Sequence, residues 1–178
     1  MDITRLYGDV EAQGPLPPVS QWHPPFCGDI DIRITHDGTW LYNGTPILRH
    51  AMVKLFAGIL RQEGDDYFLV TPVEKVEITV EDVPFIAVEM TQENGGLTFR
   101  TNVDDVVTAD AGHPLRFETG ADGFKPYICV RDGLYARLSR DLAQDIANMG
   151  EVIEHERALW FGVSSGGLFF PVIRADRL

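Results

Sequence analysis

Alternating hydrophobic and polar residues run through much of the chain and predict a protein rich in β-strands. After Gly28, Ile30, Ile32 and Ile34 alternate with charged residues, which is the pattern of a half-buried strand. Glycine-containing turns at 94–96, 120–123 and 164–167 separate pairs of such segments and predict hairpins. Further strands are predicted at 40–42, 67–70, 76–80, 85–90, 97–101, 115–118, 127–130, 159–163 and 168–172.

Two segments instead follow the period of an α-helix. The first is predicted to begin at Pro46, with Thr45 as its cap, and to end before Gly64. Its apolar face comprises Leu48, Met52, Leu55, Phe56 and Ile59. The second is predicted over residues 140–149, between the capping Ser139 and a glycine.

Arg49 interrupts the apolar face of the first predicted helix, where it projects between Phe56 and Leu60. It also lies in the first turn, where the helix dipole disfavours a cation. A guanidinium in this place needs a partner or access to water. Three interpretations stay open: an ion pair with a nearby carboxylate, contact with a ligand, or a side chain that reaches water past the rim of the apolar face.

The pattern divides the chain into three parts. Residues 1–25 are rich in proline and are predicted to form an extended N-terminal arm. Residues 26–83 form an N-terminal α+β domain. A second series of strands begins after Val83-Pro84, so residues 84–178 form a C-terminal α+β domain. The predicted fold class is α+β, with antiparallel sheets that each carry a packed helix.

The two halves share an order of residues that suggests an internal repeat. Ile34, Asp37-Gly38, Leu41-Tyr42, Arg49 and the first helix correspond in order to Val130, Asp132-Gly133, Leu134-Tyr135, Arg140 and the second helix, with a gap of four residues between the glycine and the arginine. A duplicated strand–turn–strand–helix–strand unit would explain this order. Chance is the rival interpretation, because the identities are few.

The charge of the chain restricts its partners. Lysine and arginine number 15 and aspartate and glutamate 27, so the net charge is −12. Most of such a surface repels a phosphate polymer, which argues against duplex nucleic acid, although a small phosphorylated ligand can still meet a local arginine cluster. No apolar run is long enough to span a membrane and the N-terminus lacks the features of a signal peptide, so a cytoplasmic protein is expected.

The sequence contains no recognisable catalytic motif. A phosphate-binding loop, a dinucleotide-binding glycine motif, a nucleophile elbow and a zinc-protease motif are all missing. Cys27 and Cys129 are read as free thiols, and the five histidines show no spacing of metal ligands. We therefore predict no catalytic residue, no metal site and no cofactor, and we favour a protein that is not an enzyme.

Polar and aromatic residues lie at the ends of predicted strands near the domain junction. They are Trp40, Arg49, Thr71, Glu81, Asp82, Phe85, Thr101, Asn102 and Arg131. In one interpretation they line a ligand site between the two domains, in which the arginines bind a phosphate or carboxylate and Phe85 or Trp40 stacks on a base. In the other, Glu81 or Asp82 pairs with Arg49 or Arg131 and joins the domains.

Several segments together resemble the sequence motifs of a known family. They are GDIDIRITHDGTWLYNGTPILR, LFAGILRQEGDDYFLVTPVEK, VEDVPF, FRTN and PYICVRDGLYARLSR. In these segments the chain resembles the bacterial domain-of-unknown-function family 1285. The resemblance implies an α+β fold built by duplication, with a C-terminal half superficially like a pleckstrin-homology domain. It also implies a site for a small, nucleotide-like ligand between the domains and a role in signalling.

Two functions remain open on the sequence alone. The first is a non-enzymatic protein that binds a small anionic metabolite or nucleotide and acts in signal transduction. The second is an adaptor that binds a protein partner through an exposed sheet edge and has no small ligand. The first predicts ligand binding without turnover, and the second predicts no response to small ligands.

Overall fold

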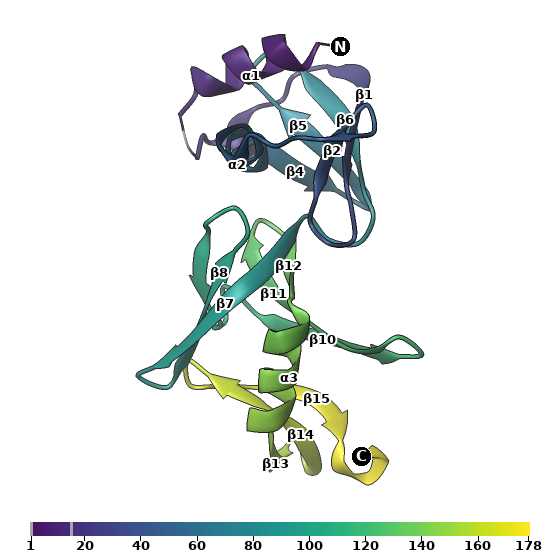
Figure 1. The fold of residues 1–178 in the computed structure, drawn as a ribbon. Helices are drawn as coiled ribbons and strands as arrows, with labels where there is room; N and C mark the ends of the chain where they lie inside the picture. Colours follow the sequence, from purple (N-terminus) through teal and green to yellow (C-terminus); the bar gives the residue numbers. More distant parts are fainter. Residues whose placement is uncertain (1, 15) are drawn as a thin grey trace. The chain divides into compact units, whose positions relative to one another are not determined.

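Each half of the chain forms its own compact unit with its own β-structure (Figure 1). The computed structural model describes residues 2–14 and 16–178, so Met1 and Pro15 of the predicted arm lie outside the described residues. The N-terminal unit comprises Met1–Pro84 and the C-terminal unit Phe85–Leu178. No helix among the described residues is both long enough and apolar enough to cross a membrane.

The N-terminal unit is a six-stranded sheet with two α-helices. Its helical elements are α1 (Ile3–Glu11), the short 3-10 helix η1 (Val19–Gln21) and α2 (His50–Gly58). Its strands are β1 (Phe26–Ile34), β2 (Trp40–Tyr42), β3 (Thr45–Pro46), β4 (Leu60–Glu63), β5 (Asp66–Val70) and β6 (Lys75–Val80), arranged in the order β3-β2-β1-β6-β5-β4.

The alternation along β1 determines which of its residues enter the core. Ile30, Ile32 and Ile34 are at most 5% exposed, whereas the charged residues between them face water. β1 pairs antiparallel with β2 and parallel with β6, so the sheet is mixed and not wholly antiparallel. Local alternation cannot indicate this parallel pair, because the two strands are joined by a long crossover that contains α2.

The predicted extended arm is wrong for residues 3–11, which form α1. Asp2 caps the helix by accepting a hydrogen bond from the Thr4 N–H at 2.9 Å. Leu6 and Val10, four residues apart, are completely buried. The prolines that argue against a helix all lie after α1, so they end this helix and do not prevent it.

The proline-rich segment after α1 is attached to the edge of the sheet by Arg61 of β4. Its Nη1 donates hydrogen bonds to the carbonyl oxygens of Val19 at 3.1 Å and Trp22 at 2.7 Å. The Nε of Arg61 also lies 3.1 Å from a carboxylate oxygen of Glu63. This arginine side chain is only 17% exposed, so it fills the space between the segment and β4.

The first predicted helix is wrong at both ends. Thr45 and Pro46 pair with β2 as strand β3, and α2 begins at His50 with Arg49 as its N-cap residue. The helix ends at Gly58, and Gly64 instead lies in the hairpin turn between β4 and β5. A helical period over a short apolar run is ambiguous with strand, and here pairing with neighbouring strands decides the outcome.

The C-terminal unit combines a six-stranded sheet, a three-stranded sheet and one α-helix. Its elements are β7 (Phe85–Glu93), β8 (Gly96–Thr101), β9 (Val106–Thr108), β10 (Leu115–Gly120), β11 (Gly123–Arg131), β12 (Leu134–Leu138), α3 (Arg140–Met149), β13 (Glu151–His155), β14 (Ala158–Ser165), β15 (Leu168–Arg174) and a final 3-10 helix, η2 (Ala175–Arg177). The sheet orders are β10-β11-β12-β7-β8-β9 and β13-β14-β15.

Helix α3 forms over the residues that the sequence predicts. Ser139 caps it by accepting a hydrogen bond from the Leu142 N–H, and Gly150 follows its last residue. Leu142 and Ile146 are its buried residues, and the helix contacts β7, β11 and β12. Cap, apolar face and terminating glycine are all local signals, so they suffice here.

The order of elements repeats between the units and agrees with the predicted duplication. A hairpin, a helix and a three-stranded antiparallel meander occur in this order as β1-β2, α2 and β4-β5-β6, and again as β11-β12, α3 and β13-β14-β15, except that the two-residue β3 lies between β2 and α2. The pairing differs: β6 joins the sheet of β1, whereas β13-β14-β15 forms a separate sheet and the parallel neighbour of β12 is β7. The fold is therefore α+β, with mixed sheets in both units.

Candidate functional site

A groove of about 440 Å³ lies between α1 and α2 in the N-terminal unit. It is lined by Tyr7, Glu11, Gly14, Ala51, Lys54 and Leu55. The half-buried Tyr7 and Leu55 supply apolar surface, and Glu11 and Lys54 lie exposed. An apolar hollow with few charged groups is the usual form of a small-ligand site.

Arg49 lies beside this groove, over one of its lining residues. The carbon at the centre of its guanidinium group is 5.2 Å from the centroid of the Tyr7 ring, a cation–π distance. The Tyr7 ring in turn makes an edge contact with the buried Phe56 of α2, with 6.4 Å between centroids. The expectation that Arg49 projects between Phe56 and Leu60 is wrong, because Arg49 precedes the helix and its side chain is exposed.

The N-terminus of α2 adds positive potential next to the groove. No side chain caps this end, and no acidic residue occupies the first turn. The partial positive charge of the helix end therefore has no neutralising carboxylate on its own first turn. Ala51, in the first turn of α2, lines the groove, and Arg49 is the N-cap residue of the same helix. This end of the groove suits an anionic group.

The other wall of the groove, α1, is held by an ion pair with a buried carboxylate. Nη2 of Arg5 lies 2.6 Å from Oε2 of Glu74, whose side chain is 6% exposed. The second oxygen of Glu74, Oε1, is buried and has no hydrogen-bond partner among the described residues. Burial of Leu6 and Val10 provides the apolar part of this attachment.

The other predicted site residues of the N-terminal unit do not line the groove, and two of them, Trp40 and Thr71, are buried. Trp40 is 2% exposed, and its indole N–H is buried without a hydrogen-bond partner among residues 2–14 and 16–178. The Thr71 hydroxyl accepts hydrogen bonds from the Val73 and Glu74 N–H groups and so shapes the turn before β6.

Glu81 lies against the turn that follows β1. Its carboxylate accepts a hydrogen bond from the His36 N–H at 2.7 Å and lies 3.6 Å from Arg33. Glu81 and this turn line an open depression together with Asp37. Hydrogen bonds from the Thr35 and Thr39 side chains lower the pKa of the Asp37 carboxyl, which keeps it ionised. Asp82, the next residue, is half-buried.

Four predicted residues gather at one end of the large C-terminal sheet, and two of them stack together. The guanidinium of Arg131 lies 5.1 Å from the centroid of the fully buried Phe85 ring. Its Nη1 is 2.5 Å from Oδ2 of Asp105. The arginine that was expected to bind a ligand or join the domains thus has a carboxylate partner within its own unit.

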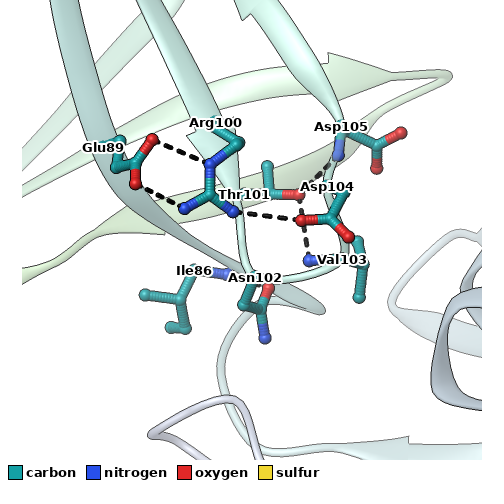
Figure 2. Close-up of polar contacts among 8 residues, drawn as sticks. All are labelled: Ile86, Glu89, Arg100, Thr101, Asn102, Val103, Asp104 and Asp105. Carbon is teal, nitrogen blue, oxygen red and sulfur yellow. Dashed lines mark hydrogen bonds and ion pairs between the residues drawn. The ribbon is translucent and has the colours of Figure 1, made fainter. Parts of the chain in front are cut away.

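Thr101 and Asn102 shape the loop that carries Asp105 (Figure 2). The completely buried Thr101 hydroxyl accepts hydrogen bonds from the Val103 N–H at 3.3 Å and the Asp105 N–H at 3.2 Å. The side-chain oxygen of Asn102 accepts from the Ile86 N–H at 3.0 Å. These groups hold the loop against β7, and this positions the carboxylate for Arg131.

An exposed ion pair lies beside this loop. Arg100 binds both carboxylate oxygens of Glu89, at 2.8 and 2.6 Å, and its Nη1 reaches Asp104 at 3.0 Å (Figure 2). Hydrogen bonds from Arg100 lower the pKa of the Glu89 carboxyl, and the carboxylates raise the pKa of Arg100. Arg100 is thus occupied by two carboxylates of its own unit.

The described residues do not bring together a nucleophile with a base or a set of metal ligands. The buried Ser165 hydroxyl donates to the Ala109 carbonyl and accepts from the Leu97 N–H, and Ser139 caps α3. Burial raises the pKa of the Cys129 thiol, which disfavours the reactive thiolate. No group of three or more His, Cys, Asp or Glu residues in the described ranges is arranged to hold a metal ion.

Sequence reasoning missed most of the groove. Tyr7 and Glu11 lie in α1, over residues for which the sequence predicts an extended arm. The signal that was present is the spacing of Ile3, Leu6, Tyr7 and Val10 after the capping Asp2. Among the predicted site residues, Arg49 is the one that lies beside the groove.

Comparison with known proteins agrees with the sequence and the fold. Residues 17–83 match a family model described as "Domain of unknown function (DUF1285), N-terminal domain", and residues 84–172 match "Protein of unknown function (DUF1285), C-terminal domain". A search of curated proteins found no match.

Two solved structures are similar to this chain. The crystal structure of a DUF1285 family protein from Silicibacter pomeroyi DSS-3 is 43% identical, with a TM-score of 0.87 over 99% of this chain and 97% of that one. A DUF1285 family protein from Shewanella baltica OS155 is 30% identical, with a TM-score of 0.57 over 67% of this chain and 91% of that one. The chain therefore belongs to the DUF1285 family.

Proposed function

We propose that the protein is a cytoplasmic, non-enzymatic binding protein for a small anionic, nucleotide-like ligand, and that the groove between α1 and α2 receives this ligand. The observation that carries the proposal is the position of Arg49 over the Tyr7 ring, next to the uncapped N-terminus of α2. Cationic and apolar groups then meet at one end of a hollow. A ligand with a flat ring and a phosphate or carboxylate combines the same two properties.

Each part of such a ligand has a counterpart in the groove. The anionic group lies near Arg49 and the first turn of α2, where the guanidinium can donate two hydrogen bonds. The ring packs on the apolar surface of Tyr7 and Leu55. Lys54 and Glu11 line the same groove with opposite charges, so the excess of positive charge comes from Arg49 and the N-terminus of α2. Binding without turnover would suit a role in signal transduction.

A thermal-shift screen of the full chain tests the proposal. The panel contains nucleotides, cyclic dinucleotides and common phosphorylated metabolites. A ligand present at a hundred times its dissociation constant should stabilise the fold by about 2.7 kcal/mol, which is roughly 5–10 °C in Tm. We expect Arg49→Met to abolish most of the shift, because it removes the cation and keeps much of the side-chain volume.

The matched control is Arg33→Met. Arg33 lies in the same unit, near Glu81 and away from the residues that line the groove, so its loss should leave the ligand shift unchanged. A shift that survives in Arg49→Met would place the site elsewhere. A flat panel at millimolar concentration would overturn the proposal for these ligand classes and would favour an adaptor that binds a protein.

A further inference from the structure

Most edge strands of this protein carry a feature that discourages pairing with another chain. Arg61 ties the segment after α1 to β4, and β3 has only two residues, one of which is Pro46. β15 contains Pro171, and β9 is only three residues long. Prolines, covering segments and short length are the usual protection of a sheet edge.

β13 lacks these features. It spans Glu151–His155, contains neither proline nor glycine, and pairs with β14 over all five residues without a bulge. No described strand pairs with its other side, because β13 ends the three-stranded sheet. The main contacts of α3 are with β7, β11 and β12. The backbone groups along the outer side of β13 therefore have no strand partner among the described residues.

The sequence of β13 is complementary to itself when the strand is reversed. We propose that β13 pairs antiparallel with β13 of a second copy of this chain, centred on Ile153, and forms a continuous six-stranded sheet across a homodimer. In this register Glu151 lies opposite His155 of the second copy, and Ile153 lies opposite its own equivalent. The Glu151 carboxylate of each copy accepts a hydrogen bond from the imidazole N–H of His155 in the other copy, so the two-fold symmetric dimer contains this pair twice.

Exposed apolar side chains lie on the other face of the same edge. Val152 is 46% exposed and Leu159 is 57% exposed. Leu159 is the β14 partner of Glu154, and Glu154 lies opposite Val152 of the second copy in this register. The aliphatic stem of Glu154 then packs between two apolar side chains, so pairing covers surface that a monomer leaves in water.

The molar mass of the full chain in solution tests the dimer. We expect sedimentation velocity to show a mass that rises from 19.9 kDa toward twice that value as the protein concentration increases through the micromolar range. His155→Glu places like charges opposite each other twice and should weaken the dimer by about tenfold or more. The exchange Glu151→His with His155→Glu restores both pairs and should restore the dimer. His23→Glu, at an exposed residue in the other unit, is the charge-matched control.

Two results would overturn the proposal. One is a wild-type chain that keeps its monomer mass at every concentration. The other is a dimer whose affinity is the same in His155→Glu, which would place the interface elsewhere. Thermal unfolding of each variant establishes that it is folded before its mass is interpreted.

A cross-linking experiment tests the register directly. Directly opposed Cα atoms in an antiparallel pair are about 4.5–5.5 Å apart, within the range of a disulfide. Ile153→Cys should therefore form a disulfide-linked dimer on mild oxidation, in a Cys27→Ser background that removes the exposed native thiol. Glu154→Cys, one residue along the same strand, should cross-link less. Equal cross-linking at both positions contradicts the register centred on Ile153.

Discussion

Arg131 and Asp105 form an ion pair of 2.5 Å beneath which the Phe85 ring lies, so one arginine joins β11, the loop after β8 and the start of β7. The side chains are 22% and 18% exposed, and water therefore screens the pair only partly. This geometry gives Arg131 a structural role in its own unit.

Arg131→Met should lower the free energy of unfolding of the C-terminal unit by about 1–2 kcal/mol, because it leaves a half-buried carboxylate without its cation. Urea unfolding measures this change. The double variant with Asp105→Asn should cost less than the sum of the two single changes, because the single changes remove the same pair. Strict additivity would show that the pair contributes nothing. Arg177→Met, at an exposed residue, is the control.

Arg5→Met should loosen α1 more than it destabilises the rest of the chain. The substitution removes the described partner of a carboxylate whose other oxygen is already buried without one. We expect the amides of Ile3–Glu11 to exchange with solvent about 5-fold to 10-fold faster, which corresponds to about 1 kcal/mol for a pair with one exposed partner. Glu74→Gln in the same chain should recover part of the protection. Unchanged exchange in α1 would show that apolar burial alone holds this helix.

Removing charge from Glu89 should destabilise the protein only where that carboxylate is ionised. Because Arg100 lowers the folded-state pKa of Glu89, the pair stabilises the fold above the ordinary pKa of glutamate. That contribution disappears as the pH falls through the lowered folded-state value. The Tm of wild type should therefore exceed that of Glu89→Gln at neutral pH, and the gap should close in acid. A gap that is independent of pH would contradict the role of this ion pair.

The two cysteines should differ in reactivity toward an alkylating reagent. Cys27 is exposed, whereas Cys129 is buried and burial raises the pKa of its thiol. We expect mass spectrometry to show one modification on the native protein, at Cys27, and two after unfolding in urea. Equal rates at both thiols in the native state would mean that β11 opens on the timescale of the reaction.

Local signals predicted the elements that depend on local residues. Ser139, the spacing of Leu142 and Ile146, and a glycine were enough to place α3 at its observed bounds. The first predicted helix failed because Thr45 and Pro46 pair with β2, and no helix-start rule contains that pairing. The parallel pairs of β1 with β6 and of β12 with β7 join strands distant along the chain, so alternation within each strand cannot reveal them.

The candidate site was harder to predict for the same physical reason. Arg49 is recognisable as an unusual arginine from the sequence, but it contacts Tyr7, which is far away along the chain. Tyr7 lies in α1, which was not predicted because the proline-rich segment that follows it indicates an extended arm. Arg131 and Asp105 are 26 residues apart, and the loop that presents the carboxylate is shaped by a buried threonine. Which charged groups meet depends on the assembled sheet and not on their spacing.

Arg61 binds the segment after α1 through the backbone of that segment and not through its side chains. Both of its hydrogen bonds end on carbonyl oxygens, which every amino acid carries. Val19 can therefore be exchanged for residues of other shape or polarity while the contact persists. One nitrogen of Arg61, Nη1, makes both bonds, while Nε of the same guanidinium lies 3.1 Å from Glu63; a lysine has only one nitrogen for all three contacts. Related chains are thus free to vary at position 19 and constrained at position 61.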